Sequence, residues 1–342
     1  MKKFIKTYEE IITPENLLIA WQDFLKGKRR RRDVALFQGR LMDNIFELYR
    51  ELRIKTYRHA GYQAFKISDP KPRHIHKAIV RDRLLHHLLY RETYPYFDKQ
   101  FIYDSYSCRL EKGTHRAVER FEVFGRKISE NTHKSVWVLK GDVRKFFASI
   151  DHGILKDILN RYIEDQDLLW LFGQVIDSFE TPGRPGIGLP LGNLTSQLLV
   201  NVYMNEFDQF VRRNLKVKYY IRYADDFVIL SSDREYLAHL LPQIEDYLSS
   251  HLKLELHPNK VFLSTLSGGV DFLGWSQFYN HRTLRTVTKK RMFKKLAQNR
   301  SPETKAAYRA LLKHGNTYKI SERAGLAEQD IITSFDKMSN SY

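Results

Sequence analysis

The sequence has little cysteine and no long hydrophobic run. Its 342 residues include one cysteine, Cys108, so an intrachain disulfide is excluded, and no Cys/His cluster has the spacing of a zinc site. No stretch approaches the roughly 18 apolar residues that a membrane span needs. The basic start is interrupted by Glu9 and Glu10 before any apolar run of signal-peptide length. We therefore expect a soluble, cytoplasmic protein without a membrane partner.

Acidic residues are scarce relative to basic ones. The chain has 57 Lys and Arg against 40 Asp and Glu, for a formal net charge of +17, and 13% of its residues are aromatic. Lys and Arg neutralise phosphates, and aromatic rings stack on bases. The 42% hydrophobic content is enough for a substantial core and argues against disorder. The composition favours a folded protein with a nucleic-acid partner.

The first 64 residues are predicted to form a helical extension. The segments PENLLIAWQDFL and LFQGRLMDNIFELYRELRIKTY carry apolar residues at helical spacing. Between them lies KGKRRRRD, Lys26 to Asp33, which is either a solvated basic turn or a phosphate contact that includes Arg29 and Arg30. Beyond them, Asp69-Pro70-Lys71-Pro72 predicts a hairpin turn between β-prone flanks.

The rest of the chain alternates strands and helices without a low-complexity linker. We predict a helix from Asp82, a strand over residues 136–143, a helix over HGILKDILNRYI, and a Gly/Pro-rich loop that opens into another helix at GNLTSQLLVN. A helix near EYLAHLLPQIEDYLSSHL is followed by short strands around LELHPNKVFL and GVDFLGWSQF. From Thr288 the pattern is basic and helical. These parts are predicted to form one connected body.

Two adjacent carboxylates stand between two apolar runs in KYYIRYADDFVIL, residues 218–230. A tight turn between two buried strands would expose Asp225 and Asp226 at its tip, where their charges repel. A divalent cation would reverse that effect, and Mg²⁺ prefers oxygen ligands. Asp142, at the end of an upstream strand, would complete a two-metal site. The plainer interpretation is a hairpin turn at Asp225 and Asp226, with Asp142 as a helix cap.

At this point the sequence resembles a reverse transcriptase, over about residues 65–275. The segments that carry the resemblance, in the family's order, are PKPRHI, YDSYSCRLEKGTHRAV, LKGDVRKFFASID, GLPLGNLTSQLLVNVYMNEFD, YADD and FLGW. The resemblance implies an α+β right-hand polymerase fold. Residues 65–275 would form fingers and palm, residues 276–342 a basic helical thumb, and residues 1–64 the helical extension.

One segment narrows the resemblance to bacterial reverse transcriptases of diversity-generating retroelements. Most relatives have Gln-Gly before the palm loop and Ser-Pro after it, whereas LGNLTSQ has Leu191-Gly192 and Ser196-Gln197. This likeness implies cDNA synthesis from an RNA template with misincorporation at template adenines, that is, mutagenic retrohoming. It also implies an RNA or DNA primer, dNTPs and a basic oligomeric accessory protein as partners.

The family resemblance assigns the metal and sugar contacts. Asp142, Asp225 and Asp226, with the carbonyl of Val143, would hold two Mg²⁺ ions, with Mn²⁺ as a substitute. Phe147, five residues after Asp142, would be the steric gate that rejects a 2′-hydroxyl and so favours dNTPs. The alternative for Phe147 is an ordinary core residue.

Further nucleotide contacts are assigned to the fingers and to the palm loop. Lys71 and Arg73 would grip the triphosphate, or else belong to a solvated turn. Lys260 would protonate the leaving pyrophosphate, or else be a surface lysine. Leu191, Gly192 and Gln197 would line the nucleotide pocket.

An apolar Leu191 in place of the family's Gln removes hydrogen-bonding capacity near the new base pair. Low fidelity would follow, unless Leu191 is simply a packing residue. The residues assigned to nucleic-acid contacts are Arg29, Arg30, Ser196, Tyr223, Gly274, Trp275, Lys289, Lys290, Arg291 and Lys294, of which the lysines and Arg291 could equally form a solvated helix face.

Three other functions stay open at this stage. An antiphage-defence or group II intron-like reverse transcriptase would use the same chemistry. A non-catalytic RNA-binding scaffold would keep the fold alone, against which the three aspartates count. An RNA-directed RNA polymerase would accept rNTPs, against which Phe147 counts.

Overall fold

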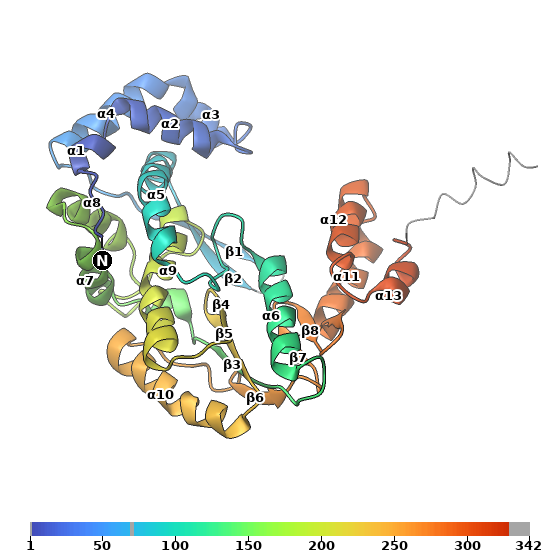
Figure 1. Ribbon diagram of the computed structural model, residues 1–342. Helices are drawn as coiled ribbons and strands as arrows, with labels where there is room; N and C mark the ends of the chain where they lie inside the picture. Colours follow the sequence, from blue (N-terminus) through green and yellow to red (C-terminus); the bar gives the residue numbers. More distant parts are fainter. Residues whose placement is uncertain (1, 69–71, 328–342) are drawn as a thin grey trace, which may run out of the picture. The chain divides into compact units, whose positions relative to one another are not determined.

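The computed structural model describes residues 2–68 and 72–327, which divide into two compact units (Figure 1). The first contains Met1–Gly113, Leu139–Ile229 and Glu235–Phe262; the second contains Thr114–Val138, Leu230–Arg234 and Leu263–Tyr342. This division differs from the three successive segments that the sequence suggests, because each unit is assembled from stretches that are distant in the chain. No described helix is both long enough and apolar enough to cross a membrane.

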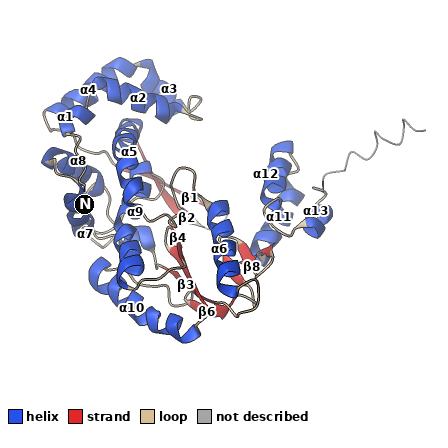
Figure 2. Ribbon diagram, in the orientation of Figure 1, coloured by secondary structure: helices blue, strands red, loops and turns tan. Residues whose placement is uncertain are grey.

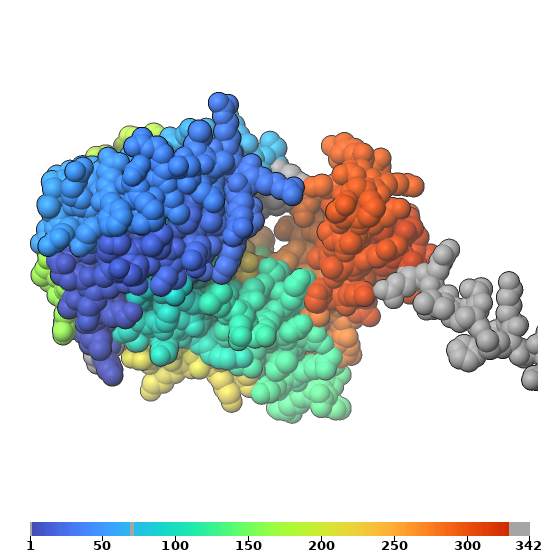
Figure 3. All heavy atoms as spheres, turned by 90° about the horizontal axis from the view of Figure 1, so that it is seen from above, coloured from blue at the N-terminus to red at the C-terminus, as the bar shows by residue number. Residues whose placement is uncertain are grey.

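The N-terminal helices belong to the first unit. They are α1 (Tyr8–Ile11), α2 (Pro14–Leu25), α3 (Arg32–Gly39) and α4 (Leu41–Arg53). The Thr13 side chain caps α2 and Pro14 begins it, as its fixed φ favours. Seen from above, their atoms (blue) cover much of this unit (Figure 3).

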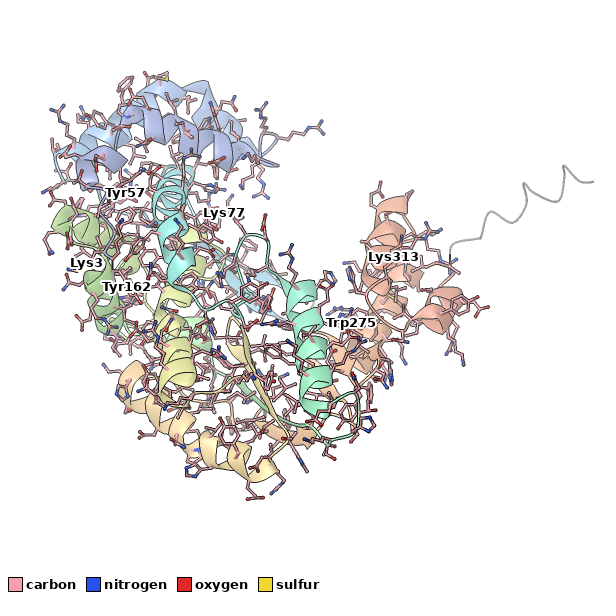
Figure 4. The ribbon with its side chains drawn as sticks, viewed as in Figure 1. Lys3, Tyr57, Lys77, Tyr162, Trp275 and Lys313 are labelled. Atoms are coloured by element: carbon pink, nitrogen blue, oxygen red, sulfur yellow. The ribbon has the colours of Figure 1, made fainter. Side chains whose placement is uncertain are left out.

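A buried tyrosine ties this helical layer to the next helix, α5 (Val80–Gln100). Tyr57, labelled in Figure 4, donates its hydroxyl proton to Asp82 Oδ1 on α5 at 2.9 Å. Both residues are fully buried. The N-terminal segment therefore packs on α5.

The strands β1 (Tyr62–Ile67) and β2 (Arg73–Ala78) form the predicted hairpin, with Ile67 opposite Arg73. The helical interpretation of the first 64 residues is wrong at its end, since helix ends at Arg53 and β1 begins at Tyr62. Pairing with β2 decides the conformation there. The predicted turn residues Asp69, Pro70 and Lys71 lie outside the described residues.

Four strands pair in one sheet in the order β4-β5-β3-β6. Strands are drawn in red in Figure 2. The strands of this sheet are β3 (Trp137–Asp142), β4 (Tyr220–Tyr223), β5 (Asp226–Ser231) and β6 (Phe262–Thr265). Gly141 lets β3 approach β5, because an added Cβ would lie 2.3 Å from the Phe227 ring. Of the strand predicted around LELHPNKVFL, only β6 and an isolated bridge at Leu256 form.

Four further helices belong to the first unit. They are α7 (His152–Tyr162), α8 (Gln166–Ile176), α9 (Leu194–Gln209) and α10 (Arg234–Leu252), as predicted for three of the four. Phe207 of α9 packs against the Phe227 ring with centroids 5.3 Å apart, and Phe210 stacks on Tyr247 of α10 at 4.0 Å. Aromatic contacts therefore fix α9 between the sheet and α10.

The second unit has its own core around a small sheet. The helix α6 (Thr114–Ser129) packs on β7 (Val270–Phe272) through Phe121 and Phe272, whose ring centroids are 5.6 Å apart. The antiparallel sheet continues with β8 (Trp275–Gln277) and β9 (Arg282–Leu284), of which β9 was not predicted. The basic helices follow as α11 (Thr286–Gln298), α12 (Pro302–Leu312) and α13 (Tyr318–Arg323).

Candidate active site

The two adjacent aspartates lie at the tight turn between β4 and β5. Tyr223 pairs with Asp226, so Ala224 and Asp225 alone connect the strands. Ala224 has a φ of 55°, the left-handed conformation that two-residue hairpin turns need and that costs a residue with a Cβ about 1 kcal/mol or more. The predicted strand–turn–strand around this motif is confirmed.

Asp142 is the last residue of β3 and meets this turn. The backbone N–H of Val143 donates to the Asp225 carbonyl at 3.1 Å, which joins the end of β3 to the turn. The segment before β6 also bonds to the end of β3, because the His257 N–H donates to the Asp142 carbonyl at 2.7 Å. Backbone hydrogen bonds therefore bring the three carboxylates together, although 83 residues separate Asp142 from Asp225 (225 − 142).

The electrostatics of the cluster favour an added positive charge. Burial and the charges of Asp226 and Asp142 raise the pKa of Asp225 to about 6. Burial also raises the pKa of Asp226, and so does the Asp142 carboxyl group, which hydrogen-bonds to it. Lys140 Nζ, 3.8 Å from Asp226 Oδ1, acts in the opposite direction. A group of acids whose ionised forms destabilise one another is suited to binding a cation.

Lys260 lies directly against this cluster. Its Nζ is 2.6 Å from Asp142 Oδ1, and its side chain is 40% exposed, whereas that of Asp142 is 8% exposed. The Lys260 N–H donates to the His257 carbonyl at 2.9 Å in the same turn that bonds to Asp142. The lysine is therefore a partner of the carboxylates and not an isolated surface charge.

The chemistry of these donors fits a hard divalent cation, which takes carboxylate and carbonyl oxygens. Asp142, Asp225 and Asp226 would supply carboxylates, and Val143 a carbonyl. Within the described ranges, however, no three His, Cys, Asp or Glu side chains are arranged closely enough to hold a metal ion. Asp142 instead pairs with Lys260, so metal binding requires local rearrangement of these side chains.

A buried ion pair beneath the turn was not identified from the sequence. Arg222 of β4 and Asp208 of α9 are both fully buried, and Nε and Nη2 of Arg222 each lie 2.7 Å from a different oxygen of Asp208. Tyr220 donates its hydroxyl proton to the same carboxylate at 2.7 Å. Arg222 Nη1 donates to the Ala224 carbonyl at 3.0 Å. This pair supports the turn that carries Asp225.

The same arginine anchors a third segment. The N–H of Arg222 donates to the Asp104 carbonyl at 3.0 Å, its carbonyl accepts from the Tyr106 N–H at 2.9 Å, and Nη2 donates to Ser105 Oγ at 3.1 Å. The sequence signal was available, since Arg222 is a charged residue inside an apolar strand. The sequence could not show which acid neutralises it.

Phe147 lies on the short 3₁₀ helix η1 (Phe146–Ser149) that follows Asp142. Phe146 is buried, whereas Phe147 is half-buried and contacts Phe146 edge-to-face at 5.6 Å between centroids. The Leu189 N–H donates to the Phe147 carbonyl at 2.8 Å. The ring predicted to select the sugar thus retains an accessible part.

The palm loop that precedes α9 is fastened to β2. The Leu191 carbonyl accepts from the His76 N–H at 3.0 Å, and Asn193 donates to the His76 carbonyl at 2.8 Å. Gly192 packs so closely on β2 that an added Cβ would lie 2.7 Å from Ile75 Cγ2. Half-buried Leu191 therefore sits on a loop whose position depends on the β1–β2 hairpin, and half-buried Gln197 lies in the first turn of α9 that follows this loop.

Two residues that are predicted to contact nucleic acid have buried side chains. Trp275 is 1% exposed and Ser196 is 2% exposed. The Trp275 ring lies against the backbone at Gly315, where an added Cβ would be 2.2 Å away. Burial therefore limits what either side chain can offer to a nucleic acid in this conformation.

The remaining predicted residues are placed as follows. Arg73 begins β2 and is exposed, Tyr223 is half-buried, and Arg29 and Arg30 are exposed before α3. Lys71 lies outside the described residues. Gly274, with a φ of 89°, forms the turn between β7 and β8. The predicted contacts Lys289, Lys290, Arg291 and Lys294 lie on α11, in the second unit.

Comparison with known proteins identifies the family of the segment that carries the three carboxylates. Residues 68–277 match the family described as reverse transcriptase (RNA-dependent DNA polymerase). Protein YkfC of Escherichia coli is 26% identical over 246 residues, which cover 60% of this chain and 61% of YkfC. The group II intron-encoded protein LtrA of Lactococcus lactis is 22% identical over 364 residues, covering 84% of this chain and 58% of LtrA. The chain spans about three fifths of the length of these relatives.

Solved structures share the fold at low sequence identity. Telomerase from Candida albicans, solved with a fragment of telomeric RNA, superposes with a TM-score of 0.52 at 10% identity, covering 80% of this chain and 55% of that one. Apo telomerase from Candida tropicalis superposes with a TM-score of 0.50 at 10% identity. The match covers 69% of this chain and 58% of the telomerase chain.

The family match covers more than half of the chain, from the β1–β2 hairpin to β8. The chain therefore belongs to the reverse transcriptase family of nucleotidyltransferases, and the α+β polymerase fold is confirmed. Members of this family generally use divalent metal ions.

Proposed function

We propose that this protein is an RNA-directed DNA polymerase that copies an RNA template into cDNA. The observation that carries the proposal is the meeting of Asp142 with Asp225 and Asp226 where β3 ends beside the β4–β5 turn. The RNA template, a DNA or RNA primer and dNTPs are the substrates that this activity needs. The high net positive charge of the protein supports a nucleic-acid partner.

The reaction is attack of the primer 3′-hydroxyl oxygen on the α-phosphorus of a dNTP, with cleavage of the bond to pyrophosphate. Two bound Mg²⁺ ions, or Mn²⁺ in their place, would supply charge stabilisation for the attacking and leaving oxygens. Asp142, Asp225 and Asp226 hold the cations in this proposal. Lys260 would give a proton to the leaving pyrophosphate, and its ion pair with Asp142 supports this role.

A primer-extension assay tests the activity. The purified protein, with a primed RNA template and labelled dNTPs, is expected to extend the primer only when Mg²⁺ is present. Asp225→Asn should abolish extension, whereas Asp246→Asn, an exposed position on α10, should not. No extension by the unaltered protein, even with its native RNA and accessory protein, would favour a non-catalytic RNA-binding scaffold.

The choice of sugar is proposed to depend on Phe147. Its half-buried ring follows Asp142 on η1 and would collide with a 2′-hydroxyl. Phe147→Ala is expected to raise rNTP incorporation relative to dNTP incorporation. If the unaltered protein already incorporates rNTPs equally well, it is an RNA polymerase instead.

We further propose that the enzyme serves a diversity-generating retroelement and is error-prone at template adenines. The support is Leu191, which puts an apolar side chain on the loop that is hydrogen-bonded to β2. Sequencing cDNA made on a defined RNA should show errors concentrated opposite adenines, and Leu191→Gln should reduce them. Uniform accuracy at all four template bases would reject this role. A basic oligomeric accessory protein is the expected partner.

A group II intron-like or antiphage-defence role is the second candidate. The likeness to LtrA, which extends over 84% of this chain, favours the intron-like branch. Genes beside the coding sequence distinguish the roles. A pair of template and variable repeats supports diversification, whereas a toxin gene or a structured non-coding RNA supports defence.

A further inference from the structure

Two buried histidines meet where the N-terminal helices give way to the β1–β2 hairpin. Nε2 of His59 and Nε2 of His86, on α5, are 3.1 Å apart, and the angle between the two ring planes is 20°. His86 is 1% exposed, and so is the side chain of His59. The proposed polymerase chemistry uses neither ring.

Hydrogen-bond partners fix which ring nitrogens of this pair carry protons. His59 Nδ1 lies 2.5 Å from the Ala60 carbonyl and 3.6 Å from Asp82 Oδ2, and both oxygens can only accept. Nδ1 of a neutral His59 is therefore protonated, and its Nε2 accepts from the Nε2–H of His86. His86 Nδ1 then carries no proton, and it is buried without a hydrogen-bond partner among the described residues.

An extra proton has no favourable place in this pair. His59 Nδ1 keeps its proton for the Ala60 carbonyl, and the two Nε2 atoms share one proton between them, so a third proton falls on His86 Nδ1. There it would be a buried donor without an acceptor, which is unfavourable. The pair is therefore stable only when both imidazoles are neutral.

Charged groups around His59 do not reverse this preference. Burial is the largest influence on the pKa of His59 and lowers it; Asp82 and the Ala60 carbonyl act in the opposite direction, and Arg81 lowers the pKa further. Asp82 is not available to His59 alone, because its oxygens already accept from the Tyr57 hydroxyl, the Ala60 N–H and Arg81 Nε. The net result is a pKa below the ordinary value.

The groups around His86 all oppose its protonation. Burial lowers the pKa of His86 well below its ordinary value, and the charges of His59, His87 and Arg83 act in the same direction. A histidine released into water has a pKa of about 6.5. The packed pair binds fewer protons than the released one, so release becomes more favourable as the pH falls through about 6.5.

The first residue of β1 packs directly on this pair. The Tyr62 ring stacks on His59 with centroids 4.9 Å apart, and its hydroxyl lies 3.3 Å from His59 Nε2. The same hydroxyl is 2.6 Å from Ser178 Oγ, and the Ser178 hydroxyl proton goes to the Val175 carbonyl. Tyr62 therefore donates to Ser178, which ties the start of the hairpin to the segment after α8.

A row of rings continues from Tyr62 to β2. Phe179 lies edge-to-face on Tyr62 at 5.8 Å between centroids, and its ring centroid is 4.6 Å from that of His76. His76 bonds through its backbone to Leu191 of the palm loop. Burial and the charge of His74 lower the pKa of His76, so this histidine responds to acid in the same direction. The row therefore holds both strands of the hairpin.

We propose that the neutral His59–His86 pair positions the β1–β2 hairpin for nucleotide binding and releases it on taking up a proton, which rests on the proposed function. Tyr62 pairs with Ala78 at the end of the hairpin that the pair holds, and Arg73, the proposed triphosphate contact, lies at the other end of the same paired strands. A shift at Tyr62 is thus carried along the strands to Arg73. Both histidines are positioning residues, because they act through Tyr62 and not on the nucleotide itself.

The KM for dNTP in primer extension, measured at pH 7.5 and pH 6, tests this role. We expect the KM of the unaltered protein to rise several-fold at pH 6. His86→Gln should keep a low KM at both pH values, because its amide can donate to a neutral His59 or accept from a protonated one. The control His239→Gln removes an exposed histidine of α10 and should leave the rise intact. An equal rise in His86→Gln and the unaltered protein would overturn the inference.

The comparison of KM values separates the hairpin from the carboxylates. The pKa of Asp225 is about 6, so kcat is expected to fall at pH 6 in all three proteins. Only the KM should distinguish His86→Gln from the other two.

Hydrogen exchange of the full chain measures the hairpin without any need for polymerisation. After correction for the intrinsic exchange rate, protection of the β1 and β2 amides should fall about tenfold from pH 7.5 to pH 6, because two released imidazoles become free to take up protons. In His86→Gln the fall should be less than about threefold. The β4 and β5 amides are the internal control and should keep their protection. Equal loss of hairpin protection in the two proteins would contradict the proposal.

Tyr62→Phe tests the link from the pair to the strand, and it replaces His86→Gln if that variant does not fold. It keeps the ring but removes the hydroxyl contacts with Ser178 and His59. The KM for dNTP should be several-fold higher already at pH 7.5, with little further rise at pH 6 and with kcat at pH 7.5 close to that of the unaltered protein. An unchanged KM at pH 7.5 would refute the link.

Failure of the proposed function gives a different pattern. If no primer is extended under any condition, but acid reduces hairpin protection in the unaltered protein and not in His86→Gln, the polymerase assignment fails and the proton-sensitive hairpin stands. If primers are extended and the KM for dNTP does not depend on pH, the polymerase assignment stands and the positioning role is removed.

Discussion

Arg222 and Asp208 form a fully buried, two-pronged ion pair directly beneath the turn that carries the paired aspartates. The guanidinium also reaches the Ala224 carbonyl, so the pair connects helix α9 to the residue before Asp225. Five donors in a planar fork allow one arginine to satisfy these acceptors at once, which a lysine cannot do. We infer that this pair positions the turn for cation binding.

Arg222→Lys tests that role. The variant keeps the charge but loses the fork, so we expect it to need several-fold more Mg²⁺ for half-maximal extension and to have a lower kcat, with the KM for dNTP nearly unchanged. The Mg²⁺ dependence of primer extension measures this.

Arg109→Lys is the control, because Arg109 also bonds to a carboxylate and to backbone carbonyls but does not contact the turn. It should lose stability without a change in Mg²⁺ dependence. The positioning role is refuted if both variants shift the Mg²⁺ requirement equally.

Asp225 is expected to destabilise the metal-free protein at neutral pH. Its pKa is about 6 in the folded state, above its ordinary value of 3.8. Between these values the folded state binds more protons than the unfolded state, so stability falls as the pH rises through this window. Asp225→Asn should therefore be more stable than the unaltered protein above pH 6, by about 2–3 kcal/mol, and the two should converge near pH 4.

Urea unfolding at pH 4 and pH 7.5 with a chelator measures this difference. Added Mg²⁺ should narrow the gap at pH 7.5 by stabilising only the protein that keeps the carboxylate. Asp246→Asn serves as the exposed control. If the stability difference between Asp225→Asn and the unaltered protein does not depend on pH, the repulsion between Asp225 and its neighbouring carboxylates is contradicted.

Gly141 is required by the close approach of β3 and β5. In Gly141→Ala the new methyl group would lie 2.3 Å from the Phe227 ring, which is itself buried. Overpacking of this kind costs about 1–3 kcal/mol of unfolding free energy. Because Asp142 follows directly, we also expect a loss of primer extension. Chemical denaturation and the extension assay measure the two effects.

Gly173→Ala provides the matched comparison. Gly173 lies inside helix α8, and an added Cβ would meet nothing within 4 Å. Alanine is favoured over glycine in a helix by about 0.5–1 kcal/mol, so this variant should be more stable and equally active. If both substitutions have the same effect, contact with Phe227 is not the reason for Gly141.

Lys260 is expected to affect the chemical step more than nucleotide binding. Its Nζ is 2.6 Å from Asp142 Oδ1, within the candidate site. Lys260→Ala should lower kcat about 100-fold, the usual range for loss of a general acid, with a smaller change in the KM for dNTP. Single-turnover extension across a pH series measures the effect.

Lys260→Arg separates proton transfer from simple charge neutralisation, because arginine keeps the charge but does not release its proton. Equal activity of Lys260→Arg and the unaltered protein would exclude Lys260 as the proton donor.

Much of the fold was predictable because its signals are local. The apolar frames on both sides of Asp225 and Asp226 predicted the β4–β5 hairpin, and the helical spacing predicted α5, α7, α9 and α10. The errors lie where pairing between distant segments decides conformation. Residues 62–64, at the end of the predicted helical extension, belong to β1 by pairing with β2, and β9 forms against β8.

The candidate site likewise has one part that the sequence predicts and one part that depends on tertiary contacts. The sequence by itself determined the carboxylates, their strand ends and the family to which they belong, since these depend on residue type and order. Only the tertiary structure decided that Asp208 neutralises Arg222, that Lys260 pairs with Asp142, and that Trp275 is buried. The physical reason is that such contacts join residues far apart in the chain, and their distances follow from how the elements pack and not from any local pattern of side chains.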